Sequence, residues 1–241
     1  MTGAAMLAEH DATPIELSWV LPLYRTSEQL GELLERIRQV SLRLRIASEV
    51  ILVDDACPEG CGALADAEAA HDPRLVVLRL PANQGQDAAL RAGLRRSRGA
   101  WSVILDADLQ DPPEAVEQLW PLRRDAPIVF ARRTGRYSTA SRRLTSHLYR
   151  AAVAMVGGLP RGACLYALLA RPVVQRINEA EGARVSLLAL IAATRERSTS
   201  VPILRSRRPS GVSGYTSLDR CRKAAGSLWQ MFVARRLNRV P

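Results

Sequence analysis

Short apolar runs alternate along this chain with stretches in which apolar residues recur every three or four positions. Short apolar runs bounded by turn residues are typical of buried strands, and the longer spacing is typical of helices that pack on one face. The predicted strands cover Glu16–Leu21, Glu49–Val53, Arg74–Leu80, Trp101–Leu105, Pro127–Ala131, Cys164–Ala170 and Thr199–Arg205. The predicted helices cover 26–40, Cys61–Ala70, Asp87–Arg98, a segment that starts at Pro112 and Pro113, Arg142–Met155, Pro172–Asn178, Val185–Thr194 and Ser217–Arg239.

The alternation of predicted strands and helices indicates an α/β fold with one mostly parallel central sheet flanked by helices. The chain has 241 residues, of which 47% are hydrophobic, and this size suits a single domain. We therefore expect a flexible N-terminus over 1–15, one domain over 16–215 and a basic amphipathic helix over 216–241. Thr26 and Gln29 have the spacing of a capping box, which predicts that the first helix begins there.

Positive charge is concentrated in two parts of the chain. The net charge is +10, with 34 Lys and Arg residues against 24 Asp and Glu residues. Residues 131–150 contain six arginines and no acid, and residues 195–241 contain eleven basic residues against two acids. Such basic zones favour phosphates or an anionic membrane surface, and arginine suits bidentate phosphate contacts. A nucleic acid is not an expected partner, because no basic patch is interleaved with aromatic residues.

The two ends of the chain bear on where the protein acts. The N-terminal stretch MTGAAMLAEHDATP contains acids and no apolar core, so it does not resemble a signal peptide. No apolar run approaches the roughly 20 residues that span a bilayer, and four cysteines without a metal-ligand pattern suit a reducing, cytoplasmic setting. The helix Ser217–Arg239 gathers Leu218, Leu228, Trp229 and Phe232 on one face. It is expected either to bind the inner face of the cell membrane peripherally or to pack on the domain or on a second copy in a homo-oligomer.

Polar residues follow three of the predicted strands at the point where each strand ends. The segments are PLYR after the first strand, DDACPEG after the second and DADLQD after the fourth. In an open parallel sheet the carboxyl ends of the strands meet at one edge, where ligands bind. We therefore expect these three segments to converge on one cleft.

The stretch ILDADLQDPPE, residues 104–114, places three carboxylates at the end of an apolar run. Unpaired carboxylates in such a place repel each other and are costly to desolvate, so the cluster predicts a cationic partner. Asp106, Asp108 and Gln110 fall on one side of an extended segment, and their oxygens suit Mg²⁺ or Mn²⁺ with phosphates completing the coordination. Asp111 falls on the other side and is predicted to start the following helix.

Several stretches of the chain also resemble one known family. The family 2 glycosyltransferases with the GT-A fold, in particular the dolichol-phosphate mannose synthase and bacterial polyprenyl-phosphate glycosyltransferase group, contain segments similar to SWVLPLYRTSEQLGELLERI, EVILVDDACPEGCGAL, LPANQGQDAALRAGLRRSRGAWSVILDADLQDPPEAV and VFARR. The resemblance covers about residues 16–215 and is most specific over 83–114. It implies a GT-A fold and a nucleotide-diphosphate sugar donor that is held with Mg²⁺ or Mn²⁺.

The resemblance also implies roles for individual residues. Those implied to bind the nucleotide donor are Pro22, Tyr24, Asp55, Asp106, Ala107 and Asp108, and Asp55 among them would contact the base. Those implied to bind the metal are Asp106, Asp108 and Gln110. Those implied to carry the catalytic step are Asp106, Asp108, Arg132, Arg142 and Ser146, the last two binding the acceptor phosphate. A later loop that matches the family contains Arg208, Gly211, Ser213 and Tyr215.

These expectations lead to one leading function and two alternatives. The leading function is an inverting, metal-dependent transfer of a sugar to a lipid-linked phosphate of the polyprenyl (dolichyl or undecaprenyl) type. A glycan hydroxyl acceptor would need a base near the sugar, and residues 161–166, where the family carries an acid, contain none. The second alternative is a non-catalytic GT-A domain that binds nucleotide or membrane without turnover.

Overall fold

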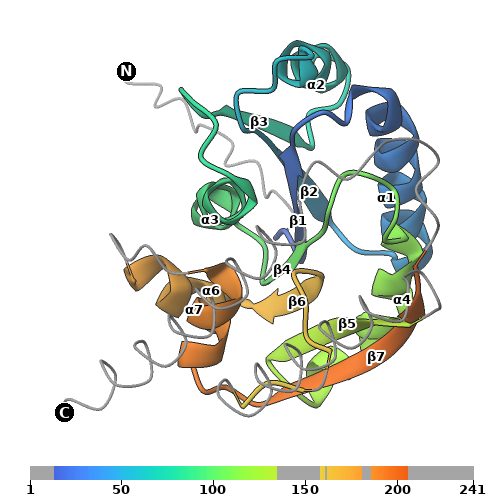
Figure 1. The fold of residues 1–241 in the computed structure, drawn as a ribbon. Coiled ribbons are helices and arrows are strands. Elements are labelled where there is room, and N and C mark those ends of the chain that lie inside the picture. Colours follow the sequence, from blue (N-terminus) through green and yellow to red (C-terminus); the bar gives the residue numbers. More distant parts are fainter. Residues whose placement is uncertain (1–13, 135–157, 161, 181–185, 206–241) are drawn as a thin grey trace, which may run out of the picture.

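The computed structural model describes residues 14–134, 158–160, 162–180 and 186–205 of the chain. Within them, seven strands form one sheet with the order β3-β2-β1-β4-β6-β5-β7 (Figure 1). The strands are β1 (Leu17–Leu23), β2 (Ser48–Asp54), β3 (Leu75–Arg79), β4 (Trp101–Ile104), β5 (Ile128–Thr134), β6 (Ala167–Ala170) and β7 (Ser198–Leu204). Strand β6 is antiparallel to both of its neighbours, and the other pairs are parallel. The prediction of a mostly parallel α/β fold is confirmed.

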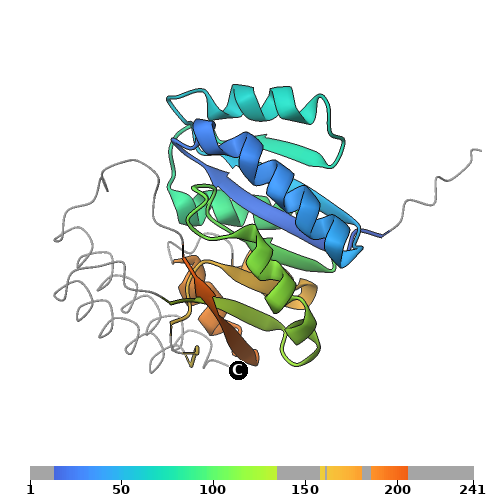
Figure 2. The ribbon, with the colours of Figure 1, turned by 90° about the vertical axis from the view of Figure 1, so that its right-hand side faces the viewer.

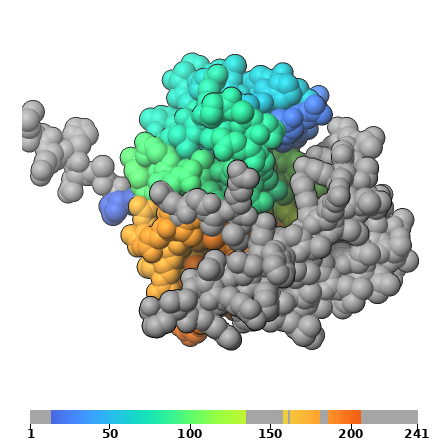
Figure 3. Space-filling view, turned by 60° about the vertical axis from the view of Figure 1, so that its left-hand side comes forward, coloured from blue at the N-terminus to red at the C-terminus, as the bar shows by residue number. Residues whose placement is uncertain are grey.

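Helices cover both faces of the sheet. The α-helices are α1 (Leu30–Leu44), α2 (Cys61–Ala69), α3 (Gln86–Arg96), α4 (Val116–Leu119), α6 (Arg171–Glu179) and α7 (Leu187–Ala193), and the 3-10 helices are η1 (Ser27–Gln29), η2 (Pro113–Ala115) and η3 (Pro121–Arg124). Helices α1, α2 and α4 bury apolar residues against one face, and Figure 2 shows α1 and α4 lying across it. Helices α3, α6 and α7 bury theirs against the other face, where Figure 3 shows α3 next to the orange α6.

Strand β1 shows why the sequences of the central strands are mostly apolar. Trp19 and Leu21 are fully buried in the core beneath α1, whereas Val20 is fully buried in the core beneath α3. Successive side chains of a strand point to opposite faces of the sheet. A strand that is covered by helices on both faces is therefore apolar at most positions, and the buried exception in β1, Ser18, donates a hydrogen bond to Oε1 of Glu49 at 2.7 Å.

Strand β1 continues through Pro22, past the predicted end at Leu21. The carbonyl of Val20 accepts from the N–H of Leu105 in the β4 segment, so even-numbered residues of β1 face β4. The pairing between β1 and β4 ends at Val20. Pro22 therefore removes no hydrogen bond from the sheet although it lacks an N–H group, and the strand runs through it.

Three local predictions need correction. Strand β6 begins at Ala167, three residues later than predicted, and β5 continues to Thr134 because it pairs with β7 along its whole length. The predicted capping box does not form. Helix α1 begins only at Leu30, after η1, and the Thr26 hydroxyl is buried without making a capping hydrogen bond.

Some predicted segments lie outside the described residues. They are the N-terminus up to residue 13 and the helices Arg142–Met155 and Ser217–Arg239. Among the residues that the structure does describe, no helix is both long enough and apolar enough to cross a membrane.

At Gly93, helix α3 packs against side chains of β1 and β2 with no room for a Cβ atom. A Cβ atom at this position would lie 2.4 Å from Cγ1 of Val20 and 3.1 Å from Cγ2 of Val53. We expect Gly93→Ala to lower the free energy of unfolding by about 1–3 kcal/mol, because overpacking against β1 and β2 outweighs the better helix propensity of alanine.

Gly31 in α1 provides the matched control for this substitution. Apart from its chain neighbours and the nearby backbone of its own helix, no atom lies within 4 Å of a Cβ built at Gly31. Gly31→Ala is expected to raise the free energy of unfolding by about 0.5–1 kcal/mol, because only the propensity gain remains. Urea denaturation measures both variants, and a stabilising effect of Gly93→Ala would contradict the packing described for α3.

Candidate active site

The polar segments that follow β1 and β2 are joined to the loop before α3 by hydrogen bonds. The backbone N–H of Arg25 donates to Sγ of Cys57 at 3.2 Å, which links the first segment to the second. Asp55 is buried, and its two carboxylate oxygens accept the N–H groups of Gln84 and Gly85 at 2.7 and 2.8 Å. The loop between β3 and α3 is therefore held against the carboxyl end of β2.

The same loop also reaches the segment that follows β4. Gly85 has a φ of 89°, a conformation that favours glycine, and the chain enters α3 directly after it. Gln86, the first residue of α3, donates a side-chain amide hydrogen bond to Oδ1 of Asp106. The segments after β1, β2 and β4 thus share one polar edge of the sheet, which confirms the predicted convergence.

Exposure alternates along the acidic segment that follows β4. Leu105, Ala107 and Leu109 are buried. The three predicted metal ligands between and after them, Asp106, Asp108 and Gln110, are each partly exposed. The backbone is not extended throughout, because Leu109 has a φ of 56° and Oδ1 of Asp108 accepts the N–H of Gln110 at 3.1 Å.

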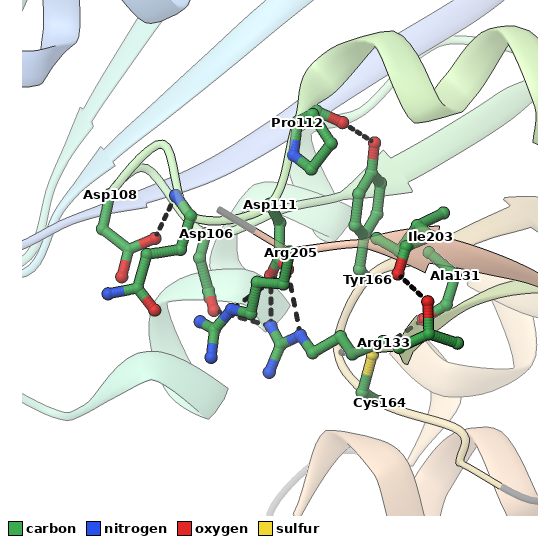
Figure 4. Close-up of polar contacts among 12 residues, drawn as sticks. Asp106, Asp108, Asp111, Pro112, Ala131, Arg133, Cys164, Tyr166, Ile203 and Arg205 are labelled. Atoms are coloured by element: carbon green, nitrogen blue, oxygen red, sulfur yellow. Dashed lines mark hydrogen bonds and ion pairs between the residues drawn. The ribbon is translucent and has the colours of Figure 1, made fainter. Parts of the chain in front are cut away.

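Asp111 does not start the following helix as predicted. Helix η2 begins at Pro113 with no side-chain cap, and the Asp111 side chain is fully buried. Its Oδ1 lies 3.1 Å from Nε of Arg133 and 3.2 Å from Nε of Arg205, and its Oδ2 contacts Nη2 of Arg133 (Figure 4). A buried carboxylate requires a cationic partner, and here the neighbouring strands β5 and β7 supply two.

Arg133, which had no predicted role, reaches the aspartates, and its neighbour Arg132 is the arginine predicted for the catalytic step on the acceptor phosphate. Nη2 of Arg133 lies 3.1 Å from Oδ2 of Asp106 while the same guanidinium holds Asp111. Arg132 is the preceding residue of β5, and its side chain lies against Gly162, where a Cβ would be 2.8 Å from Cγ of Arg132. Successive residues of a strand point to opposite sides, so only one of the two arginines can face the acidic segment.

The electrostatics of this cluster reflect its burial. Burial raises the pKa of Asp106 to about 6, with Arg133 opposing the rise and Asp108 and Asp111 adding to it. Burial also lowers the pKa of Arg133, but the neighbouring carboxylates of Asp111 and Asp106 outweigh it, so the net shift is upward and the guanidinium stays charged. The pKa of Cys164 is raised by burial, which keeps it a thiol that donates to the Ala131 carbonyl at 3.1 Å.

The residues predicted to line the nucleotide pocket lie at the ends of β1 and β2. Tyr24 is 40% exposed, and the Arg25 guanidinium lies 5.6 Å from the centroid of its ring. Pro22 is partly buried within β1, and Asp55 uses both carboxylate oxygens to hold the loop before α3. The predicted acceptor-side residues Arg142 and Ser146 lie outside the described part of the chain, as does the loop that matches the family at Arg208, Gly211, Ser213 and Tyr215.

Sequence reasoning missed three residues of this edge. They are Gln86, Arg133 and Arg205. A signal existed for Arg133, because alternation along a strand allows only one of two consecutive arginines to face the acids. No local signal existed for Arg205, which is 94 positions from Asp111 in the chain and meets it only because β7 pairs with β5.

Asp106, Asp108 and Gln110 carry the oxygen ligands that Mg²⁺ and Mn²⁺ prefer. Within the described ranges, no three His, Cys, Asp or Glu side chains lie close enough together to hold a metal ion by themselves. A metal ion at Asp106 and Asp108 would therefore need further oxygen ligands, which substrate phosphates can supply. The residues fit such an ion, because Asp106 already attracts the cationic Arg133.

Residues 18–165 match the family model described as Glycosyl transferase family 2. This chain belongs to glycosyltransferase family 2. The matched range contains the segments after β1, β2 and β4 together with Arg133. The family resemblance seen in the sequence is confirmed.

Curated relatives of this family 2 glycosyltransferase include several undecaprenyl-phosphate 4-deoxy-4-formamido-L-arabinose transferases. The protein from Pseudomonas aeruginosa (strain LESB58) is 38% identical over 196 residues, which cover 79% of this chain and 54% of the relative. The protein from Sodalis glossinidius is 30% identical over 212 residues, which cover 85% of this chain and 65% of the relative. The chain thus spans roughly half to two thirds of the length of these relatives.

Solved structures show the fold of this family 2 glycosyltransferase. A mannosyltransferase from Pyrobaculum calidifontis in complex with GDP-Man and Mn²⁺ has a TM-score of 0.62 and 22% identity, covering 96% of this chain and 68% of that protein. A glucosyl-3-phosphoglycerate synthase from Mycobacterium tuberculosis, in complex with Mn²⁺, UDP and glucosyl-3-phosphoglycerate, has a TM-score of 0.62 and 15% identity, covering 92% and 80%. The predicted GT-A fold is confirmed.

Proposed function

We propose that this chain moves a sugar from a nucleotide-diphosphate donor to a polyprenyl phosphate. The observation that carries the proposal is the carboxylate pair Asp106 and Asp108 beside two arginines, Arg133 and Arg205, at one edge of the sheet. Carboxylates of this kind suit a metal-bound diphosphate, and arginines suit a second phosphate. Membership of the family and the names of the curated relatives, which are undecaprenyl-phosphate sugar transferases, support the same acceptor.

The donor would lie along the ends of β1, β2 and β4. Tyr24 would pack against the nucleoside, and Asp55 would hold the loop before α3 beside it. Asp106, Asp108 and Gln110 would hold Mg²⁺ or Mn²⁺ together with the donor diphosphate. The metal ion, when bound, neutralises the negative charge that develops on the departing diphosphate. The two solved structures that contain Mn²⁺ with GDP-Man or with UDP support this assignment.

The acceptor phosphate needs positioning more than activation. A phosphate monoester is mostly ionised near neutral pH because its second pKa is about 6. One of its oxygens would form the bond to the anomeric carbon while the bond from that carbon to the diphosphate breaks, which inverts the configuration. The groups that would orient this phosphate are Arg132, Arg142 and Ser146. A hydroxyl acceptor would need a base, and residues 162–166 provide no carboxylate.

A transfer assay with the full chain tests the proposal. Nucleotide-diphosphate sugars with different bases and sugars are offered with Mg²⁺ or Mn²⁺ to a short polyprenyl phosphate, and in parallel to a glycan with free hydroxyls. Transfer to the polyprenyl phosphate that EDTA abolishes is the expected result. Transfer to the glycan alone would assign a hydroxyl acceptor. If none of the tested donors is turned over, the result would support a non-catalytic domain.

Arg142→Ala tests the acceptor side of the proposal. The variant is expected to lose at least about a hundredfold in transfer to a polyprenyl phosphate, because one charge-assisted phosphate contact is removed. Its affinity for the donor, measured by calorimetry with Mn²⁺ present, is expected to stay unchanged. Loss of donor affinity with retained acceptor affinity would mean that the two phosphate sites are assigned the wrong way round.

A lipid-linked acceptor would bring the protein to a membrane surface. The basic amphipathic stretch 217–239 would favour such an association, with roughly 1 kcal/mol per basic residue near anionic lipid. Co-sedimentation of the full chain with anionic vesicles, compared with a chain that ends at residue 216, measures this contribution directly.

A further inference from the structure

Arg133 contacts two carboxylates that have different surroundings. Its Nη2 lies 3.1 Å from Oδ2 of Asp106, and its Nε lies 3.1 Å from Oδ1 of Asp111. The side chain of Asp111 is 0% exposed, whereas those of Asp106 and Arg133 are 21% and 28% exposed. The guanidinium thus joins a buried acid to an acid at the surface of the site (Figure 4).

Asp111 and Asp106 depend on Arg133 to different degrees. Asp111 has a second cationic partner, because Nε of Arg205 lies 3.2 Å from its Oδ1. For Asp106, the contacts described are one cation, Arg133, and one neutral amide donor, Gln86. A divalent ion that binds the carboxylate of Asp106 through Oδ2 therefore meets the positive charge of Arg133 at that oxygen atom.

We propose that Arg133 is a resident counter-ion of Asp106 that the divalent metal ion displaces, and that Asp111 retains the displaced guanidinium beside the site. This inference rests on the metal site of the proposed function. The contact of Nε with Asp111 does not involve Asp106, so it survives the exchange and keeps Arg133 close to the bound phosphates. The arginine therefore opposes the metal ion in the empty site and supports it once a diphosphate is present.

The proposal predicts that replacing Arg133 increases the affinity for the metal ion. A purely structural role for Arg133 does not predict an increase. Removing a cation that competes for the same carboxylate strengthens metal binding. Removing a residue that only builds the site would weaken binding or leave it unchanged. The two explanations therefore predict opposite outcomes for the metal alone, without nucleotide and without turnover.

The test measures Mn²⁺ binding to the full chain by the loss of the free-ion resonance signal. Arg133→Gln is expected to lower the Kd for Mn²⁺ alone by about tenfold or more, because like charges so close together repel strongly in a partly buried site. Arg132→Gln removes the same charge from the preceding residue of β5, which lies against Gly162, and is expected to change this Kd by less than about twofold.

The same titration is repeated with UDP or GDP present. Arg133→Gln is then expected to bind Mn²⁺ about tenfold more weakly than the unaltered chain, because the displaced guanidinium no longer supports the diphosphate. Arg205 still pairs with Asp111 in Arg133→Gln. Thermal unfolding checks that this variant folds. If Arg133→Gln does not fold, Arg133→Lys is measured in its place. Lysine cannot form the bidentate contacts of arginine, so the Kd for Mn²⁺ alone is expected to be about threefold lower than that of the unaltered chain.

Three outcomes overturn the inference, and they are distinguishable. An unchanged or higher Kd for Mn²⁺ alone in Arg133→Gln contradicts the counter-ion role while leaving the proposed function intact. An equal decrease in Arg132→Gln shows a general charge effect and contradicts the specific exchange at Asp106. If the unaltered chain binds no Mn²⁺ with UDP or with GDP, the metal site of the proposed function fails, and the inference fails with it.

Discussion

Asp108→Ala is expected to lower metal-dependent transfer by about a thousandfold or more while the fold remains intact. Asp108 is partly exposed, and its carboxylate accepts the N–H of Gln110 in a local turn. A partly exposed side chain with a local hydrogen bond contributes little to the stability of the core. Its loss would leave Asp106 as the only carboxylate proposed to hold the metal, so the diphosphate would lose its bridge to the protein.

Transfer rates and donor affinity with Mn²⁺ measure this effect. Asp125→Ala is the control, because it removes an exposed carboxylate that follows η3 and lies outside the proposed site. We expect full transfer from this control and a thermal transition near that of the unaltered chain in both variants. Unchanged nucleotide-sugar affinity in Asp108→Ala would refute the assignment of the metal site.

Asp111→Ala is expected to act on stability, lowering the free energy of unfolding by about 3–5 kcal/mol. The carboxylate is fully buried, and it is the partner that Arg133 and Arg205 share. Both arginine side chains are about a quarter exposed, so water can replace the carboxylate only in part. Removal of one partner from a buried ion pair is costly because the charges that remain have lost their compensation.

Chemical denaturation of Asp111→Ala and Asp108→Ala makes the comparison within one loop. The second variant is expected to lose less than about 1 kcal/mol, since a partly exposed carboxylate contributes little. A loss of that small size in Asp111→Ala as well would show that the two arginines find other partners, and the central role given to Asp111 would be wrong.

The order of elements could be read from the sequence because it depends on local patterns. Apolar runs and helical periodicity identified the strands and most of the helices, and the acidic segments fell at carboxyl ends because a parallel sheet brings those ends together. The same reasoning ended β1 at Leu21, because the cost of a proline depends on whether the neighbouring strand extends that far. Strand length is a property of the sheet as well as of the segment.

Individual partners in the site could not be read in this way. Asp111 looked like a helix start because Pro112 and Pro113 follow it, yet its partners come from β5 and from the end of β7. Asp55 is predicted to contact a nucleotide base, and the sequence gives no sign that its oxygens also accept two N–H groups from a loop about 30 residues further along the chain. These contacts depend on strand order, which local periodicity does not encode.

Because β6 runs in the reverse direction, one part of the site comes from segments that follow parallel strands, and another part comes from the segment that precedes β6. Its pairing with β4 and β5 is antiparallel, so the residues that precede β6, instead of those that follow it, lie at the edge where β4 and β5 end. Tyr166 donates to the Pro112 carbonyl at 2.8 Å, and Cys164 donates to Ala131, from this incoming segment. Its length and composition can therefore change without shifting the parallel strands that present Asp55 and Asp106. Under the proposed function, changes in this segment would alter the acceptor side while the donor side stays fixed.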